Sequence, residues 1–287
     1  EGIDIALRAM LDAGDEVLIP QPSYVSYEPC TILAGGRPVI IELKAEDGFK
    51  LKASQILEKV TDRTKILILP FPNNPTGSIL NIDELKEIAR VCIEKDLYVI
   101  SDEIYCELTY EGEHASIVQI EGMRERTILI NGFSKSYAMT GWRLGYATGP
   151  KEIIAQMTKI HQYAIMCAPT TSQYAAVEAL AHGDLEVAKM RESYNQRRRY
   201  LLHRFSELGM TCFEPQGAFY VFPSIKRFNM SSEEFATKLL EEQKIAIVPG
   251  TAFGECGEGY VRVSYAYSMD RLKEAISRIE KFVRSLS

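Results

Sequence analysis

The sequence predicts an α/β protein: a large domain with a mostly parallel sheet flanked by helices, followed by a smaller α+β domain at the carboxyl end. Short apolar runs typical of strands alternate with amphipathic helical stretches, which is the pattern of a layered α/β architecture. The runs near residues 66, 98 and 128 are almost wholly apolar, as strands buried on both faces should be. After residue 183 the pattern changes to a long charged helix and shorter elements, which indicates a second domain.

The predicted large domain opens on a helix over residues 1–10, with no capping residue ahead of it. Between two of the predicted strands lies a helix with a clear start, because Asn81 suits the N-cap and Glu84 completes a capping box. The strands are predicted at residues 16–20, 37–43, 65–69, 97–101, 127–131 and 144–148.

The predicted small domain begins with a charged helix over residues 184–208. A second helix is capped by Ser231 with Glu234, and a terminal helix begins at Asp270. The strands of this part are predicted at residues 219–222, 245–248 and 260–264. We place the boundary near residue 185, which gives domains over residues 1–185 and 186–287.

Composition and charge exclude several classes of protein. The chain has 287 residues, 46% hydrophobic and 25% charged, which is ordinary globular composition. No apolar run reaches the ~18 residues that a membrane helix needs, so no membrane partner is expected. The net charge of -6 argues against binding to nucleic acid. The one tight basic run, Arg197-Arg198-Arg199, is interpreted as a solvated helix face.

The cysteines and histidines predict no metal site. The six cysteines form no C-x-x-C pair, and we interpret them as reduced thiols in a cytoplasmic protein. The four histidines are scattered, with no spacing typical of metal ligands or of a catalytic triad. The glycine-rich segment 254–259 is not followed by a helix, so it does not predict a dinucleotide-binding loop.

A lysine in a pattern of small residues is the first candidate for chemistry. Lys135 lies in the segment 132–145, directly after an apolar strand, where a charged side chain is costly unless it is paired or functional. Nearby glycines let a flat ligand approach the backbone. Arg143 in the same segment offers a rigid fork of donors suited to phosphate. An isolated lysine in a loop would simply be solvated; the surrounding residues favour a site.

Two further segments follow strands at their carboxyl ends, where open α/β sheets bind ligands. One is the turn-rich loop 72–77, with Asn74 before a proline; its alternative interpretation is an ordinary turn. The other holds Asp102 and Tyr105, after the apolar run 97–100. A carboxylate at Asp102 is consistent with a helix cap or a loop charge as well as with a site.

An aromatic residue, an arginine and a glycine complete the candidates. Tyr24 follows a proline turn after the first strand; aromatic residues at such places more often belong to a core. Arg262 stands inside a short strand pattern, where its charge must be paired unless it faces water from an edge strand. Gly217 lies in the segment 215–220.

The segment 132–145 resembles the cofactor-lysine signature of class I aminotransferases, in the aspartate and aromatic aminotransferase-like part of the fold-type I pyridoxal-phosphate superfamily. The resemblance extends over the whole chain. It implies an enzyme that moves an amino group from an L-amino acid to a 2-oxo acid, with pyridoxal 5'-phosphate held by Lys135 as a Schiff base. It also implies a homodimer.

The resemblance assigns roles around the cofactor. Lys135 would transfer the substrate's α-proton, and Ser134 and Arg143 would lie near the cofactor phosphate. Asp102 would keep the ring nitrogen protonated, as a buried carboxylate partner can. Tyr105 would hydrogen-bond the phenolic oxygen.

The resemblance also assigns the substrate side of the site. Tyr24 would stack on the cofactor ring. Arg262 would grip the substrate carboxylate with its two parallel donors. Asn74 would bond the phenolic oxygen and help to hold the same carboxylate, and Gly217 would lie beside the substrate.

The sequence departs from the family at its amino end, where members usually continue further, so we expect a truncated chain that binds the cofactor more weakly than a full-length form. A carbon–sulfur β-lyase on the same fold stays an alternative, because it shares the lysine and the aspartate. The aminotransferase-like sensor domain of a transcription regulator is a second alternative. The amino acid and the oxo acid stay open.

Overall fold

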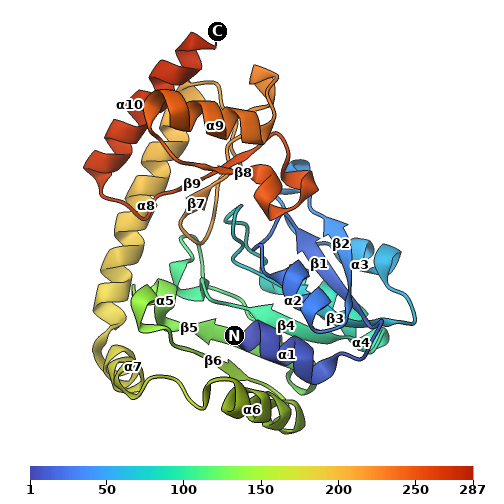
Figure 1. The fold of residues 1–287 in the computed structure, drawn as a ribbon. Coiled ribbons are helices and arrows are strands. Elements are labelled where there is room, and N and C mark those ends of the chain that lie inside the picture. The colour runs from blue at the N-terminus through green and yellow to red at the C-terminus, as the bar shows by residue number, and fades with distance from the viewer. Residues whose placement is uncertain (287) are drawn as a thin grey trace.

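The computed structural model describes residues 1–286 and has an α/β architecture, which confirms the predicted fold class. Its main sheet has six strands in the order β2-β1-β3-β4-β5-β6. The first five run parallel, and β6 pairs antiparallel with β5 (Figure 1). The strands are β1 (Glu16–Gln21), β2 (Arg37–Glu42), β3 (Thr64–Leu69), β4 (Tyr98–Asp102), β5 (Thr127–Gly132) and β6 (Gly145–Thr148).

The central strands are apolar because both of their faces are buried. Along β3, Leu67 and Leu69 point into one core, whereas Ile66 and Ile68 point into the other. One core is closed by α3 (Ala53–Lys59) and α4 (Ile82–Glu94), the other by α1 (Gly2–Met10), α2 (Tyr27–Leu33) and α6 (Lys151–Ile165). The sheet is therefore held between two layers of helices, and only its strand ends are open to ligands.

The capping signals in the sequence are confirmed. The Asn81 side chain accepts hydrogen bonds from the backbone N–H groups of Asp83 and Glu84 at the start of α4. The Glu84 carboxylate accepts in return from the Asn81 N–H, at 2.8 Å. Ser231 likewise accepts from the Glu234 N–H at the start of α9. Each cap is worth about 1 kcal/mol of stability.

The carboxyl-terminal part has its own three-stranded antiparallel sheet, in the order β7-β9-β8. Its elements are α8 (Asp184–Glu207), β7 (Tyr220–Val221), α9 (Ser232–Gln243), β8 (Val248–Pro249), β9 (Val261–Ser264) and α10 (Met269–Ser285). The strand predicted at residues 245–248 is wrong over most of its length, because ladder pairing with β9 begins only at Val248.

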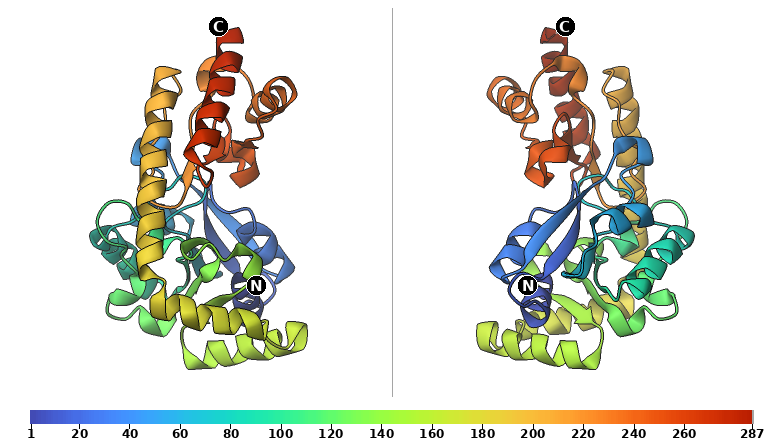
Figure 2. Two further views of the ribbon diagram at one scale, coloured as in Figure 1. Left: turned by 90° about the vertical axis from the view of Figure 1, so that its left-hand side faces the viewer. Right: turned by 90° about the vertical axis from the view of Figure 1, so that its right-hand side faces the viewer.

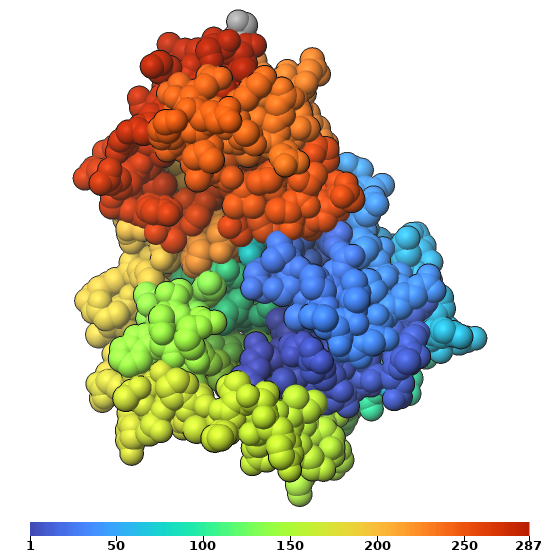
Figure 3. Space-filling view, in the orientation of Figure 1, coloured from blue at the N-terminus to red at the C-terminus, as the bar shows by residue number. Residues whose placement is uncertain are grey.

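Helix α8 runs along the side of the molecule and contacts both parts. It packs on β7 and on the turn Cys106–Leu108 that follows β4. Figure 2 shows it extending from α7 (Thr170–His182) up to the level of α9 and α10, and Figure 3 shows the carboxyl-terminal part as an upper lobe. The domain boundary near residue 185 stays a prediction.

One arginine on α8 corrects the sequence analysis. Arg198 was expected on a solvated face but is only 3% exposed. Its guanidinium donates to the Pro215 carbonyl at 2.6 Å and pairs with Glu111 at 3.2 Å and Glu214 at 3.4 Å. The charge is buried because α8 covers the segment that leads into β7, and these oxygens replace the lost water.

Candidate active site

The candidate residues meet at the carboxyl edge of the main sheet. Asn74 lies in the loop after β3, Asp102 is the last residue of β4, and Lys135 lies in α5 (Phe133–Ser136) directly after β5. Neighbouring parallel strands deliver their carboxyl ends to one edge, so three segments far apart in sequence converge there. Arg262 reaches the same edge from β9, the central strand of the second sheet.

Asp102 is a buried carboxylate with both oxygens bonded. The Tyr27 hydroxyl donates to Oδ2 at 2.8 Å, and the backbone N–H of Ile104 donates to Oδ1 at 3.2 Å. Burial raises the pKa of Asp102, while these donors and the positive charge of Lys135 oppose that rise. The side chain thus caps the turn that follows β4, which was one alternative, but its burial and its tyrosine partner go beyond a cap.

Lys135 lies within electrostatic range of the other charged groups. Burial lowers its pKa, and the positive charges of Arg143 and Arg262 lower it further, whereas Asp102 opposes them. Its ammonium nitrogen is 5.9 Å from the centre of the Phe219 ring. A lysine in these surroundings loses its proton more readily than a solvated one, which suits a nucleophile or a base.

Arg262 is held by an amide and by two aromatic rings. Its Nη1 donates to the Asn74 Oδ1 at 2.9 Å. The guanidinium carbon lies 4.4 Å from the centre of the Tyr220 ring and 4.8 Å from that of Phe253. Its buried Nε has no hydrogen-bond partner within residues 1–286. The alternative of an edge-strand arginine facing water is therefore wrong, and a donor is left for a ligand.

Tyr105 is buried beside a second tyrosine. Its hydroxyl lies 3.0 Å from the hydroxyl of Tyr220, and burial raises its pKa well above the usual value. Gly217 lies at the same junction, where its backbone N–H donates to the Gly77 carbonyl at 2.9 Å. A Cβ at Gly217 would come within 2.6 Å of the Pro72 Cβ, so only glycine fits this close approach.

Ser134 and Arg143 line a separate cavity of about 550 Å³ together with Gly2, at the N-terminus of α1. The Arg143 backbone is left-handed, and its side chain donates to the Thr140 carbonyl at 2.8 Å. A helix N-terminus, a hydroxyl and a guanidinium are groups that bind anions. Glu1, whose carboxylate is bonded to His161 at 2.8 Å, also lines this cavity. This arrangement suits a phosphate group next to Lys135.

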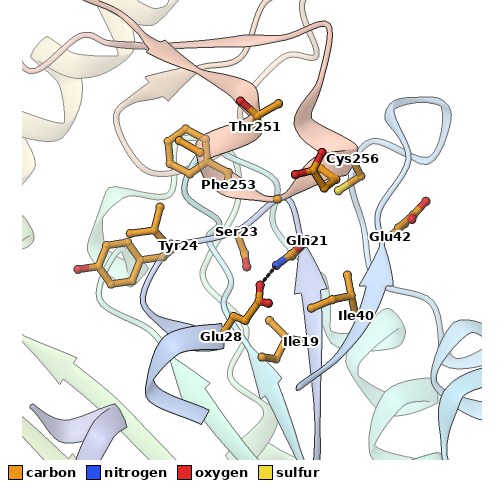
Figure 4. Close-up of a pocket in the computed structure, with 14 residues that line it drawn as sticks. Ile19, Gln21, Ser23, Tyr24, Glu28, Ile40, Glu42, Thr251, Phe253 and Cys256 are labelled. Carbon is orange, nitrogen blue, oxygen red and sulfur yellow. Dashed lines mark hydrogen bonds between the residues drawn. The ribbon is translucent and has the colours of Figure 1, made fainter. Parts of the chain in front are cut away.

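Tyr24 is half exposed and lines another cavity of about 450 Å³, between the end of β1 and the turn Gly250–Phe253. Figure 4 shows its ring below that of Phe253 on one side of this cavity, with Gln21 and Glu28 hydrogen-bonded at 3.1 Å on the floor. The Tyr24 ring also meets Tyr27 edge-on, with 5.7 Å between ring centres.

Sequence reasoning assigned no role to two residues of this site, Tyr27 and Tyr220. No local signal marks either, because each finds its partner only through packing. Glu103, next to Asp102, is bonded away from these residues: its carboxylate binds His114 at 2.7 Å and accepts from Ser116 at 2.6 Å. Within residues 1–286 no group of three or more potential metal ligands occurs, and no helix is long and apolar enough to span a membrane.

Comparisons with known proteins agree with this picture. A family model described as aminotransferase class I and II matches residues 1–279. A putative aminotransferase, YugH, of Bacillus subtilis (strain 168) is 49% identical over 283 residues, which is 99% of this chain and 73% of the relative. An aspartate aminotransferase of Pyrococcus abyssi is 47% identical over 98% of this chain and 73% of its own length. The crystal structure of an aromatic aminotransferase from Pyrococcus horikoshii OT3 aligns with a TM-score of 0.97 at 45% identity, over 100% of this chain and 78% of that one.

A mostly parallel sheet between two layers of helices, with candidate ligand-binding residues at its carboxyl edge, places the protein in the α/β class. With these matches, the chain belongs to the class I and II aminotransferase family. The members are transferases that act on amino acids and oxo acids, and pyridoxal phosphate is their expected cofactor.

Proposed function

We propose that this chain moves an amino group from an L-amino acid to a 2-oxo acid, with pyridoxal 5'-phosphate bound to Lys135. The observation that carries the proposal is the convergence of Lys135, directly after β5, with Asp102 at the end of β4 and with Arg262, whose Nη1 donates to Asn74, at one edge of the main sheet. The charges of Asp102, Arg143 and Arg262 all act on the pKa of Lys135. The Lys135 amine thus lies near an acid that suits a ring nitrogen, Asp102, and near two guanidinium groups. Of these, Arg143 suits a phosphate and Arg262 a carboxylate. Each of these groups is needed by the cofactor or by an amino acid.

The residues present fit the cofactor. Asp102 is a buried acid that a protonated ring nitrogen would stabilise in its charged form. The cavity at Ser134 and Arg143 offers anion donors beside α1. Tyr105 supplies a hydroxyl near the same carboxylate. Tyr24, a half-exposed ring in the neighbouring cavity after β1, would supply the stacking surface. The unpartnered Nε of Arg262 would be satisfied by a substrate carboxylate.

When bound, pyridoxal phosphate supplies an electron sink for the bond to hydrogen at the substrate's α-carbon. The Lys135 amine, whose lowered pKa favours its neutral form, would take that proton from the α-carbon and give it to the cofactor's former aldehyde carbon. Asp102 would hold a proton at the ring nitrogen, while Tyr105 and Asn74 would donate to the phenolic oxygen. Arg262 orients the substrate through its carboxylate, and Gly217 leaves room beside it.

Arg262 provides a prediction about binding. Replacing Arg262 by lysine keeps the charge but loses the fork of parallel donors, so we expect kcat/KM for the amino acid to fall about 100-fold or more, mainly through KM. Steady-state kinetics of holoenzyme with one amino acid would measure it. Arg227→Lys, in the turn Lys226–Phe228, is a matched control that should leave KM unchanged. A fall confined to kcat would contradict the role in carboxylate binding.

The substrates are tested by a panel. Similar proteins include aspartate, aromatic and N-acetyl-LL-diaminopimelate aminotransferases, so the panel should hold acidic, aromatic and aliphatic amino acids and N-acetyl-LL-diaminopimelate. Each is mixed with 2-oxoglutarate or pyruvate, and the bound cofactor's absorbance is followed. We expect at least one pair to exchange amino groups. Release of pyruvate from cysteine or cystathionine without an acceptor, and no exchange, would favour the β-lyase alternative.

We also propose a homodimer. Helices α6 and α7, which Figure 2 shows together at the end of the molecule away from the carboxyl terminus, carry exposed aromatic and methionine side chains. Tyr163 is 93% exposed, Met166 81% and Tyr174 75%. Such side chains are enriched in protein interfaces and depleted on free surfaces. Sedimentation equilibrium should give twice the chain mass, and Tyr163→Asp with Tyr174→Asp should shift the equilibrium towards monomer; a monomeric wild type would contradict this.

Two remaining features of the proposal concern location and domains. All six cysteines are free thiols, as expected for a cytoplasmic protein. The start of α8 at Asp184 supports a division into a cofactor-binding domain over residues 1–185 and a small domain over residues 186–287.

A further inference from the structure

Tyr220 is a buried tyrosine that lies between two parts of the site. It belongs to β7, in the second sheet, and is 6% exposed. The face of its ring meets the guanidinium of Arg262 at 4.4 Å. Its hydroxyl, at the other end of the ring, lies 3.0 Å from that of Tyr105, which follows β4 in the main sheet. A single side chain thus touches both the substrate-binding arginine and the cofactor-facing tyrosine.

We infer that Tyr220 is a positioning residue that orients the Tyr105 hydroxyl towards the cofactor through a hydrogen bond and supports Arg262 with its ring. The inference rests on the proposed function, because it concerns how Tyr105 and Arg262 serve it. Tyr220 itself is not a catalytic residue, since it acts through its two neighbours.

The physical reason lies in the hydroxyl pair. Burial raises the pKa of both tyrosines, so both stay neutral and each hydroxyl has one proton to donate. If Tyr105 is to donate to the cofactor, its oxygen is free to accept, and Tyr220 is placed to donate to it. A hydroxyl that accepts one hydrogen bond donates a stronger second one. Tyr220 therefore fixes the direction of the Tyr105 proton and strengthens the bond it makes.

The ring provides the second contact. A cation over an aromatic face is stabilised by the ring's electrons, most strongly where water is excluded. Arg262 lies over Tyr220 and Phe253 together, with the Asn74 amide at its end. The Tyr220 ring thus fixes the position of the Arg262 guanidinium, whereas the Tyr220 hydroxyl fixes the direction of the hydrogen bond that Tyr105 donates. Substitutions can separate the two contributions.

Other ionisable groups also interact electrostatically with this pair. Asp102 and Tyr27 act on Tyr105. Tyr24 and Tyr194 act on Tyr220, and Arg262 acts on both tyrosines. Substitution by phenylalanine at Tyr220 changes none of these charges. A change in titration behaviour would therefore report the lost hydroxyl and not a new charge in the site.

The test is the pH titration of the holoenzyme's cofactor absorbance in Tyr220→Phe. The phenolic oxygen of the cofactor carries more negative charge when the nitrogen joined to Lys135 has lost its proton. Weaker donation from Tyr105 disfavours that form, so the midpoint should rise. A neutral hydrogen bond contributes about 0.5–1.5 kcal/mol, which limits the rise to roughly 0.4–1.1 pH units.

Controls decide whether the effect passes through Tyr105. Tyr265→Phe removes another buried hydroxyl of the same region, one that donates to the Ala218 carbonyl at 3.3 Å, and should not move the midpoint. In a Tyr105→Phe background, Tyr220→Phe should add no further shift. Tyr220→Leu, which also removes the ring, should raise the KM for the amino acid more than Tyr220→Phe does.

The outcomes are distinct. An unchanged midpoint in Tyr220→Phe, or a full additional shift in the Tyr105→Phe background, would overturn the hydroxyl's role. Equal KM values for the Phe and Leu variants would overturn the ring's role. Wild-type protein that shows no cofactor absorbance at all would instead overturn the proposed function on which both depend.

Discussion

Replacing Lys135 by alanine should abolish amino transfer while leaving the fold intact. The residue lies in a short helix at the sheet edge, and within residues 1–286 its ammonium group makes no direct ion pair. Asp102 loses only a longer-range positive charge and keeps its hydrogen bonds from Tyr27 and Ile104. Without the amine no group in the site takes the α-proton, and we expect kcat to fall by about 10⁴-fold or more. The cofactor should also become removable by dialysis, because its covalent link is gone.

The measurement is single-turnover kinetics of the half-reaction, with Lys86→Ala as control. Lys86 is exposed on α4 and pairs only along the helix with Asp83, at 2.8 Å. Its loss should change neither rate nor cofactor retention. Borohydride reduction of the wild type followed by peptide mapping should label Lys135. A label on another lysine, or an active Lys135→Ala variant, would refute the assignment of the amine.

Asp102→Asn should separate activity from stability. The substitution keeps the size of the side chain but removes the charge that, in the proposed function, would hold a proton at the cofactor ring. The amide oxygen can still accept from the Ile104 N–H, whereas the amide NH2 must donate to the Tyr27 oxygen in place of the bond that the carboxylate accepts. Loss of such preorganised electrostatic stabilisation lowers kcat by about 10²–10³-fold. The cofactor-free protein should instead become more stable at neutral pH, because the native state no longer buries an anion.

The direction in which pH changes the stability of the cofactor-free protein follows from the linkage between proton binding and folding. Burial raises the folded-state pKa of Asp102, so between the ordinary carboxyl pKa and this raised value the native state binds more protons than the unfolded state. Stability of the cofactor-free wild type is therefore lost as pH rises through that window. Thermal unfolding against pH should show this fall in the wild type and a smaller one in Asp102→Asn. Asp62→Asn, at an exposed position, is the control; identical profiles for wild type and Asp102→Asn would contradict the buried charge.

The sequence predicted the central strands to within a residue or two, because a strand buried in the sheet must consist mainly of apolar residues. β3 and β4 are buried over most of their length and β5 over about half of its own, so all three appear as largely apolar runs. Helices α6 and α7 were not given ranges, and the reason is visible in their exposed apolar residues. Met157 and Ala176 are buried while Tyr163 and Tyr174 are exposed, so no single apolar stripe marks a core-facing side.

For the site, motifs located the residues that follow strands, but not those that act through tertiary contacts. Tyr27 and Asp102 are separated by 75 positions, and Tyr105 and Tyr220 by 115. No spacing rule connects such pairs. The prediction for Arg198 was wrong for the same reason. The oxygens that its guanidinium binds belong to segments that only folding brings together.

The setting of Arg262 has a consequence for selectivity. Its guanidinium has already lost most of its water to two aromatic rings, and one of its donors is engaged by Asn74. A ligand with a full negative charge neutralises the buried positive charge of Arg262. A neutral group leaves that charge without a counter-ion. Esters and amides of the amino acid differ from the substrate only in lacking the carboxylate charge. Their kcat/KM should therefore fall by far more than the loss of one contact would suggest.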